Sequence, residues 1–366
     1  MNIRIHTQDS ISEPLSFSIA NIDISVVNAL RRTLLTDIEI WGMYNKIKIA
    51  NNTSKLTNEI LQNRISCIPV HIPIESDDAP ELEISLHVVN DTSSVMVVTS
   101  QDFVISHKQT GEILSTEQTR AIFPPDPITG DFIDIVRLRP EIATIQGKTI
   151  AGEELHITCE LEKVTSSISA MFNAVSLSTL WNTEDKDRQP DVLAQRQQGW
   201  QQEGRSPVEI ERETKNWWLL DAKRVCIPNS FEFAVESVGI YTNYELMRKA
   251  CDVIMQSLDD WTKKMDDNTL IIMPSNTTLT NGFDITVDSG NSTIGNLINN
   301  KLYAQYYQKK KYLTYCAYGK FHPHNDTSTI RIAAVEEPTI LIIHTMLKTC
   351  IGEIENQINS IRAAFN

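Results

Sequence analysis

Residues 25–35 read SVVNALRRTLL, and this short run sets the pattern that the rest of the chain follows. Ser25 is a good N-cap residue, so we expect a helix of about three turns to begin near it. One face of that helix is apolar, which predicts burial. The opposite face carries Asn28, Arg31 and Arg32, with no carboxylate beside them. From its residue types alone, this face is best interpreted as exposed to solvent. Interpreting it as a docking surface requires independent evidence of a partner.

A second run, residues 293–303 (TIGNLINNKLY), aligns with residues 25–35 without a gap. Each run follows a strand-like Phe-x-Ile sequence, and each half of the chain ends in a long amphipathic helix pattern. The shared order predicts two copies of one module. Two such modules would bury their apolar helix faces against each other, as an intramolecular version of a two-fold dimer. Where the first copy has its two arginines, the second has Asn299 and Asn300, so the copies cannot bind one partner in the same way.

These patterns predict an α+β fold of two dimerisation modules, each an antiparallel sheet with long helices, packed as an intramolecular pseudo-dimer. The first module is expected to comprise residues 1–72 and 216–268. Between them, residues 73–215 predict a mainly β insert domain, whose polar excursion at residues 182–215 is part helix and part loop. Residues 269–366 are expected to form the second, smaller module.

The C-terminal pattern predicts a long helix from about Pro338, whose apolar residues form one narrow stripe beginning at Ile340. Such a stripe is typical of a helix lying along another helix, although a core helix of its own domain gives the same pattern. A polar, turn-rich segment at residues 266–281 is expected to link the halves. The residues expected at the intramolecular interface are Val26, Leu30, Leu34, Ile294, Ile298, Leu302, Ile343, Leu347, Ile351, Ile354 and Ile358.

The net charge of −14 on 366 residues argues against a protein that binds nucleic acid over its whole surface, because phosphate contacts need clustered lysines and arginines. No uncharged apolar run reaches the ~18 residues of a membrane span. The N-terminus has no signal-peptide pattern, so an intracellular protein is expected. The six cysteines never form a CxxC pair. We therefore expect no cofactor, no metal site, and no stable contact with DNA or membrane.

The motifs of an independent enzyme are absent from the sequence. There is no GxxxxGKS/T phosphate loop, no GxSxG nucleophile motif, no HExxH metal motif and no aspartate-rich triplet of the kind that holds polymerase magnesium. His322 and His324 flank a proline and have the chemistry of metal ligands, but an isolated pair more often caps a turn. No catalytic residue is predicted.

Three motifs together resemble the signature of the alpha-like subunits of RNA polymerase: residues 28–35 (NALRRTLL), 52–61 (NTSKLTNEIL) and 64–70 (RISCIPV). These subunits are the bacterial alpha N-terminal domain, the archaeal D subunit and the third-largest subunit of eukaryotic polymerase II. Residues 231–239 (FEFAVESVG) are similar to the closing strand of the same module. The last third resembles the smaller partner, the archaeal L subunit or eukaryotic eleventh subunit, through residues 292–297 (STIGNL).

The resemblance implies a non-catalytic assembly platform of multisubunit DNA-directed RNA polymerase. In that family the subunit pair binds the second-largest subunit first and the largest next, and a small zinc-binding subunit is a further expected partner. A fusion of both partner types resembles the arrangement in some large DNA viruses of eukaryotes, which implies a protein of the host cytoplasm and the virion. The residues expected to contact the second-largest subunit are Asn28, Arg31, Arg32, Asn52, Thr53, Ser54, Glu59 and Arg64.

The sequence departs from the family pattern at Asn58, where the family has an acidic residue, and at Asn63, where a histidine is usual. The metal-binding cysteine cluster of some relatives is absent, so no iron–sulfur or zinc site is implied. Glu59 and Arg64 lie on one expected helix, where a surface ion pair worth under ~1 kcal/mol explains them as well as a partner contact. Two other classes stay open: a free-standing scaffold or transcription regulator of the same fold, and a nucleic-acid-binding module.

Overall fold

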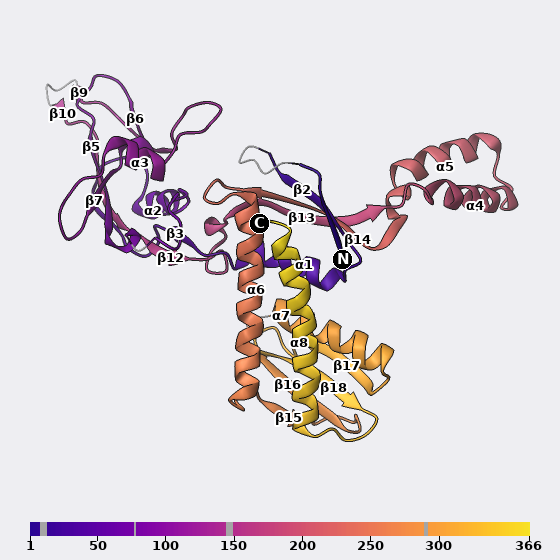
Figure 1. Ribbon diagram of the computed structural model, residues 1–366. Coiled ribbons are helices and arrows are strands. Elements are labelled where there is room, and N and C mark those ends of the chain that lie inside the picture. Colours follow the sequence, from indigo (N-terminus) through magenta and orange to yellow (C-terminus); the bar gives the residue numbers. More distant parts are fainter. Residues whose placement is uncertain (8–12, 77, 144–148, 289–291) are drawn as a thin grey trace. The chain divides into compact units, whose positions relative to one another are not determined.

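The structure, a computed structural model, is a mixed fold of helices and antiparallel sheets, as the sequence predicts (Figure 1). It describes residues 1–7, 13–76, 78–143, 149–288 and 292–366. The α-helices are α1 (Ile24–Thr36), α2 (Asn58–Ser66), α3 (Thr116–Ile122), α4 (Gln189–Gln202), α5 (Pro207–Leu219), α6 (Asn243–Asp266), α7 (Ser292–Leu302) and α8 (Ile340–Ala363). None of the helices in these ranges is both long and apolar enough to cross a membrane.

The chain divides into two compact units. Unit 1 comprises Met1–Leu34, Leu177–Glu236 and Asn243–Asn366. Unit 2 comprises Leu35–Ser176 and Ser237–Thr242. The boundaries of these units differ from those of the predicted modules. The units are defined by contacts within each of them, whereas the predicted modules follow the internal repeat.

The first sheet of unit 1 has the strand order β1-β2-β14-β13. Its strands are β1 (Asn2–Ile5), β2 (Leu15–Ala20), β13 (Val175–Glu184) and β14 (Cys226–Ser237). β2 alternates buried and half-buried residues, as expected of a strand with one face in the core. Phe17 of β2 stacks on Phe233 of β14, with ring centroids 5.1 Å apart. The predicted apolar face of α1, from Val26 to Leu34, is buried.

The cap of α1 is Asp23, so the predicted cap at Ser25 is wrong. Asp23 Oδ1 accepts hydrogen bonds from the main-chain nitrogen of Ser25 at 2.8 Å and from its Oγ at 2.6 Å. Asp23 directly precedes Ile24, the first helical residue, so its carboxylate reaches the free main-chain amide of Ser25 in the first turn.

The second sheet of unit 1 has the strand order β15-β16-β18-β17. Its strands are β15 (Ile272–Pro274), β16 (Gly282–Asp288), β17 (Leu313–Gly319) and β18 (Thr327–Ala334). β15 lies inside residues 266–281, which the sequence analysis predicted to be a linker. That prediction is wrong for β15, because Ile272 pairs with Ile285 of β16. After α7 the chain continues as a π-helix over Tyr303–Lys309.

The two sheets of unit 1 share one plan. In each, a strand that leads into a short helix (β2 into α1, β16 into α7) pairs with a strand that leads into a long helix (β14 into α6, β18 into α8). The remaining strands flank these central pairs in the same order. The order of elements is thus repeated, as the alignment of the two short runs predicts.

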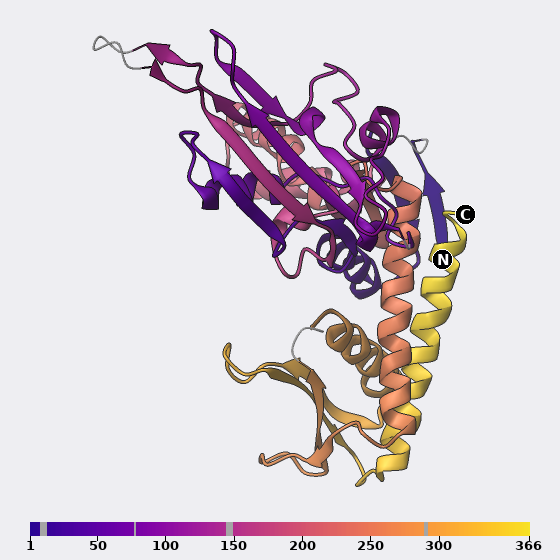
Figure 2. The ribbon, with the colours of Figure 1, turned by 90° about the vertical axis from the view of Figure 1, so that its left-hand side faces the viewer.

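The long helices α6 and α8 lie side by side and antiparallel (Figure 2). Asp252 of α6 accepts from Arg362 Nε at 2.6 Å, and Asp266, near the other end of α6, pairs with Lys348. α8 begins at Ile340, after its cap Thr339, slightly later than predicted. Ile340 is 53% exposed and so is not part of the buried stripe.

Unit 2 contains a four-stranded sheet of order β4-β11-β5-β7 and three two-stranded sheets, β6-β8, β12-β3 and β9-β10. The strands are β3 (Ile40–Gly42), β4 (Ile47–Asn52), β5 (Leu82–Val89), β6 (Met96–Thr99), β7 (Val104–His107), β8 (Asp134–Leu138), β9 (Ile142–Ala143), β10 (Thr149–Ile150), β11 (Glu154–Glu160) and β12 (Glu162–Val164). Leu61 and Ile65 of α2 are fully buried in this unit's core.

The polar excursion of the sequence is largely helical. It holds α4 and α5, which belong to unit 1 and pack around a small cluster of Leu193, Trp217 and Ala222. Ser206 caps α5 by accepting from the main-chain nitrogen of Glu209, whose carboxylate accepts from Ser206 in return. This reciprocal cap and the cluster explain why a segment with few aliphatic residues is ordered.

Candidate assembly surfaces

On the outward face of α1, Asn28 and Arg31 hold each other. Arg31 Nε donates to Asn28 Oδ1 at 3.0 Å, and both residues are half-buried. The main-chain oxygen of Arg31 accepts from Ser178 Oγ of β13 at 3.3 Å. Among the residues described, no protein atom pairs with the two Nη atoms of Arg31. The guanidinium therefore keeps donors whose geometry suits a carbonyl or carboxylate acceptor.

Arg32 reaches α7 instead. Its Nε donates to Thr293 Oγ1 at 2.9 Å, and its Nη2 donates to Ser292 Oγ at 3.1 Å. Both hydroxyls belong to the first turn of α7, so Arg32 ties one short helix to the start of the other. Sequence reasoning gave Arg32 only a partner contact and missed this intramolecular role.

Asn300 makes the matching contact from α7. Its Nδ2 donates to Asp23 Oδ1, the carboxylate that caps α1. In the alignment of the two runs, Arg32 stands opposite Asn300 and Ser25 stands opposite Thr293. Each helix thus contacts the start of the other through the same position. Reciprocal contacts of this kind are what a two-fold axis produces.

Buried apolar side chains from both halves of the chain lie in unit 1. Phe365, just after α8, is fully buried, and its ring meets those of Phe17 (5.0 Å between centroids) and Tyr244 (5.6 Å) edge-on. The residues predicted at the interface between the halves are all buried: Val26, Leu30, Leu34, Ile294, Ile298, Leu302, Ile343, Leu347, Ile351, Ile354 and Ile358.

The other predicted partner residues belong to unit 2, so they form a candidate surface separate from the face of α1. Asn52 Oδ1 accepts from the main-chain nitrogen and Oγ of Ser54, and Asn52 Nδ2 donates to the oxygens of Leu56 and Asn58. Thr53 Oγ1 accepts from a main-chain nitrogen of β11. These side chains therefore hold the loop before α2 in shape. Asn58 serves that loop where the family has an acidic residue.

Glu59 and Arg64 do not pair with each other in the part of the chain that the structure describes. Glu59 lies in the first turn of α2, where hydrogen bonds from its own main-chain amide and from Thr57 hold the pKa of its carboxyl below the usual value. Arg64 Nη2 donates to the main-chain oxygen of Asp134 at 2.6 Å. The surface ion pair considered from the sequence is therefore not formed.

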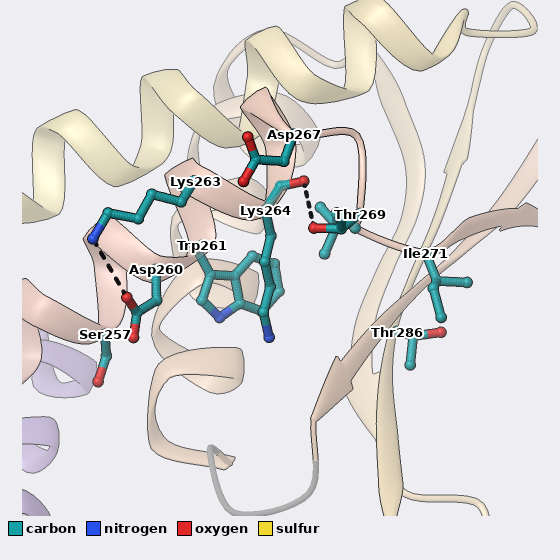
Figure 3. Close-up of a pocket in the computed structure, with 10 residues that line it drawn as sticks. Ser257, Asp260, Trp261, Lys263, Lys264, Asp267, Thr269, Ile271 and Thr286 are labelled. Atoms are coloured by element: carbon teal, nitrogen blue, oxygen red, sulfur yellow. Dashed lines mark hydrogen bonds and ion pairs between the residues drawn. The ribbon is translucent and has the colours of Figure 1, made fainter.

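A cavity in unit 1 lies beside the C-terminal part of α6 (Figure 3). It measures about 650 Å³. Its charged groups balance: Lys263 pairs with Asp259 at 2.7 Å and reaches Asp260 at 3.8 Å. Trp261, 6% exposed, also lines it.

Metal ligands do not gather in the described residues: no group of three His, Cys, Asp or Glu side chains there is placed to hold a metal ion. His322 Nδ1 accepts from the main-chain nitrogen of His324 at 3.1 Å, which is a turn-capping contact. Burial raises the pKa of the thiols of Cys159, Cys251, Cys316 and Cys350 to about 12. These cysteines are therefore protonated and unreactive at neutral pH.

Comparison with known proteins gives this geometry a family. Residues 16–258 match the RNA polymerase Rpb3/Rpb11 dimerisation domain. The chain belongs to this family. The matched residues include α1 and most of α6 but not α7 or α8. The family match therefore does not cover most of the second half. What relates the second half to the first is the repeated strand order and the reciprocal helix contacts.

Among similar proteins, a conjugation stage-specific protein of Tetrahymena thermophila is 28% identical over 176 residues, 44% of this chain and 54% of that protein. The human subunit RPAC1 of DNA-directed RNA polymerases I and III is 34% identical over 70 residues, 19% of this chain and 20% of that subunit. Subunit Rpo3 of the Thermococcus kodakarensis polymerase is 33% identical over 73 residues, covering 19% and 28%. The chain spans about half the length, or less, of these relatives.

Proposed function

We propose that this chain is a non-catalytic assembly subunit of a multisubunit DNA-directed RNA polymerase. Membership of the Rpb3/Rpb11 dimerisation family carries the proposal, and polymerase subunits among the similar proteins support it. Hydrogen bonds between the short helices α1 and α7 are the kind of contact that an assembly subunit uses. The chain contributes a surface on which larger subunits meet.

The platform is an intramolecular pseudo-dimer, a D-type and an L-type subunit fused in one chain. Support comes from the reciprocal contacts of Arg32 with Thr293 and of Asn300 with Asp23. The repeated strand order of the two sheets supports it as well. An isologous contact would normally join two identical chains, so its presence within one chain suits a fused pair.

Docking is asymmetric in this proposal. Arg31 on the first copy offers its unpaired Nη donors to the second-largest subunit, and the largest subunit follows. The corresponding position of the second copy is Asn299, which has no such fork. The loop shaped by Asn52 and the first turn of α2 form the second contact region, in unit 2.

Affinity purification of the tagged full chain from its native source tests this function. We expect the two largest polymerase subunits to co-purify with it. A stable particle that lacks both large subunits would overturn the proposal and favour a free-standing scaffold of the same fold. Steep salt-dependent DNA binding by the isolated chain would favour a nucleic-acid-binding module instead.

The residue-level test uses Arg31→Ala, because Arg31 lies off the apolar face and makes no contact with α7. Loss of a charged hydrogen bond should weaken capture of the second-largest subunit by about 1.5–3 kcal/mol, with unchanged thermal stability. Arg32→Ala should lower stability as well, because it removes the contact to Ser292 and Thr293. Arg212→Ala, an exposed arginine on α5, is the matched control. Equal capture by Arg31→Ala and the control would contradict the assignment.

A further inference from the structure

A pocket in unit 2 lies where the loop before α2, α2 itself and strand β8 meet. Its volume is about 450 Å³. Lys55 and Leu56 come from the loop, Arg64 comes from α2, and the remaining wall is residues 134–137 of β8. The function proposed above places a partner contact at this loop and helix but does not specify the chemistry of the partner's segment.

The rim of the pocket is strongly cationic. Lys55, Arg64 and Arg137 surround it, and Asp134 is the one carboxylate among its lining residues. Arg64 Nη2 donates to the main-chain oxygen of Asp134, and Arg137 Nη2 lies 3.4 Å from the carboxylate of Asp134. That ion pair is exposed, with 71% and 46% of the side chains accessible, so water screens it. Lys55 makes no hydrogen bond or close ion pair with the described residues, although its charge helps to lower the pKa of the Glu153 carboxyl.

The floor of the same pocket is apolar. Ile135 and Val136 at its base pack into the core of unit 2 and have almost no accessible surface, so half-buried Leu56 supplies the aliphatic surface that a ligand reaches. A cationic rim above an aliphatic floor matches a ligand with a negative group next to hydrocarbon. An acidic residue beside an aliphatic one, on an exposed segment of a protein, has this combination.

The charge of the whole chain favours a protein over a nucleic acid as the occupant. The net charge is −14, so a cluster of three cations with one carboxylate is a local exception. Nucleic acid binding uses a longer basic stripe that follows repeated phosphates, whereas these cations encircle one small pocket. The apolar floor adds contacts that a phosphate would not use.

We propose that this pocket docks an acidic–aliphatic segment of a large polymerase subunit, with Lys55 and Arg137 pairing with its carboxylate. The inference rests on the proposed function and adds the chemistry of the partner's segment. Arg64 holds the wall of the pocket through Asp134, and the aliphatic floor receives the neighbouring side chain. Complementary charge of this kind fixes the register of a partner and speeds its encounter.

The test compares Lys55→Glu and Arg137→Glu with Arg212→Glu, an exposed arginine on α5, in the full chain co-expressed with the large subunits. We expect each pocket variant to reduce recovery of the large subunits at least about tenfold, and the control to leave it unchanged. Recovery equal to the control, with large subunits still bound, would overturn this inference and leave the proposed function standing. Recovery of no large subunit by the unmodified chain would overturn both.

A second measurement covers the case in which a charge reversal perturbs folding. A photo-crosslinking amino acid placed at Lys55, which is exposed, should attach to a peptide of a large subunit, and mass spectrometry identifies that peptide. We expect an aspartate or glutamate next to an aliphatic residue within it. Crosslinks to peptides without an acidic residue, or to nucleic acid, would overturn the proposal.

Discussion

Replacing Phe365 by alanine should destabilise the sheet of the opposite half of unit 1. Phe365 follows α8 in the second half, but its fully buried ring contacts Phe17 of β2 and Tyr244 of α6, both in the first half. Truncating a buried phenylalanine costs about 3–5 kcal/mol, because transfer free energy is lost and a cavity remains. Phe365→Leu keeps most of the apolar volume, so its loss should be about 1–1.5 kcal/mol, mainly from the edge-on ring contacts.

Urea-induced unfolding measures this effect. Trp261 on α6 is 6% exposed and provides a fluorescence signal from unit 1. The matched control is Phe321→Ala, because Phe321 is 65% exposed and its ring lies beside the guanidinium of Arg331, 4.9 Å from the centroid. That loss should be about 1 kcal/mol or less.

Hydrogen exchange adds the location of the change. In Phe365→Ala, the amides of β2 should exchange faster than in the parent chain, because Phe17 loses one of its ring contacts. A midpoint for Phe365→Ala equal to that of Phe321→Ala, with unchanged exchange in β2, would refute the view that the two halves share one core.

Three further outcomes follow from local geometry. Gly295→Ala should lower the melting temperature despite alanine's better helix propensity, because the new Cβ would lie 2.6 Å from Tyr318 Cε2; Tyr318→Ala should relieve the loss. Hydrogen bonds from Arg331 hold the pKa of Asp284 low, so its stabilisation is present above about pH 4 and is lost as pH falls further; Asp284→Asn should remove that part of the pH dependence in chemical unfolding. Alkylation at pH 8 should modify exposed Cys67 before the buried thiols, as peptide mapping would show.

The sequence predicts the elements of unit 1 that have strong periodicity. In α1 and α8, apolar residues recur along one face, and burial follows that face from Val26 to Leu34 and from Ile343 to Ile358. The apolar periodicity of a helix predicts which face is buried, whatever surface covers that face. The sequence of the helix alone is therefore enough for the prediction. Ile340 is the exception, because the start of α8 lies beyond the contact with α6.

Features that depend on distant contacts are not readable in the same way. From the sequence, Arg32 is expected either to be exposed to solvent or to contact a partner. Only the position of α7 in the structure shows that Arg32 donates to Ser292 and Thr293. β15 is three residues long and lies in the short apolar run of residues 270–274 (LIIMP), which the polar segments on either side of it obscure, and its pairing with β16 makes it a strand. The pocket in unit 2 needs Lys55 and residues 134–137 together, which no local pattern predicts.

The connection between α6 and β15 is short. The main-chain nitrogens of Thr269 and Leu270 both donate to the oxygen of Lys264, which closes the end of α6 and turns the chain directly toward the second sheet. Joining two modules by so short a tether makes their association a first-order step, independent of protein concentration. Synthesis then yields the two modules in equal numbers, and neither accumulates as an orphan or pairs with its own copy. In the proposed fused pair of polymerase subunits, this removes one bimolecular step and one source of dosage imbalance.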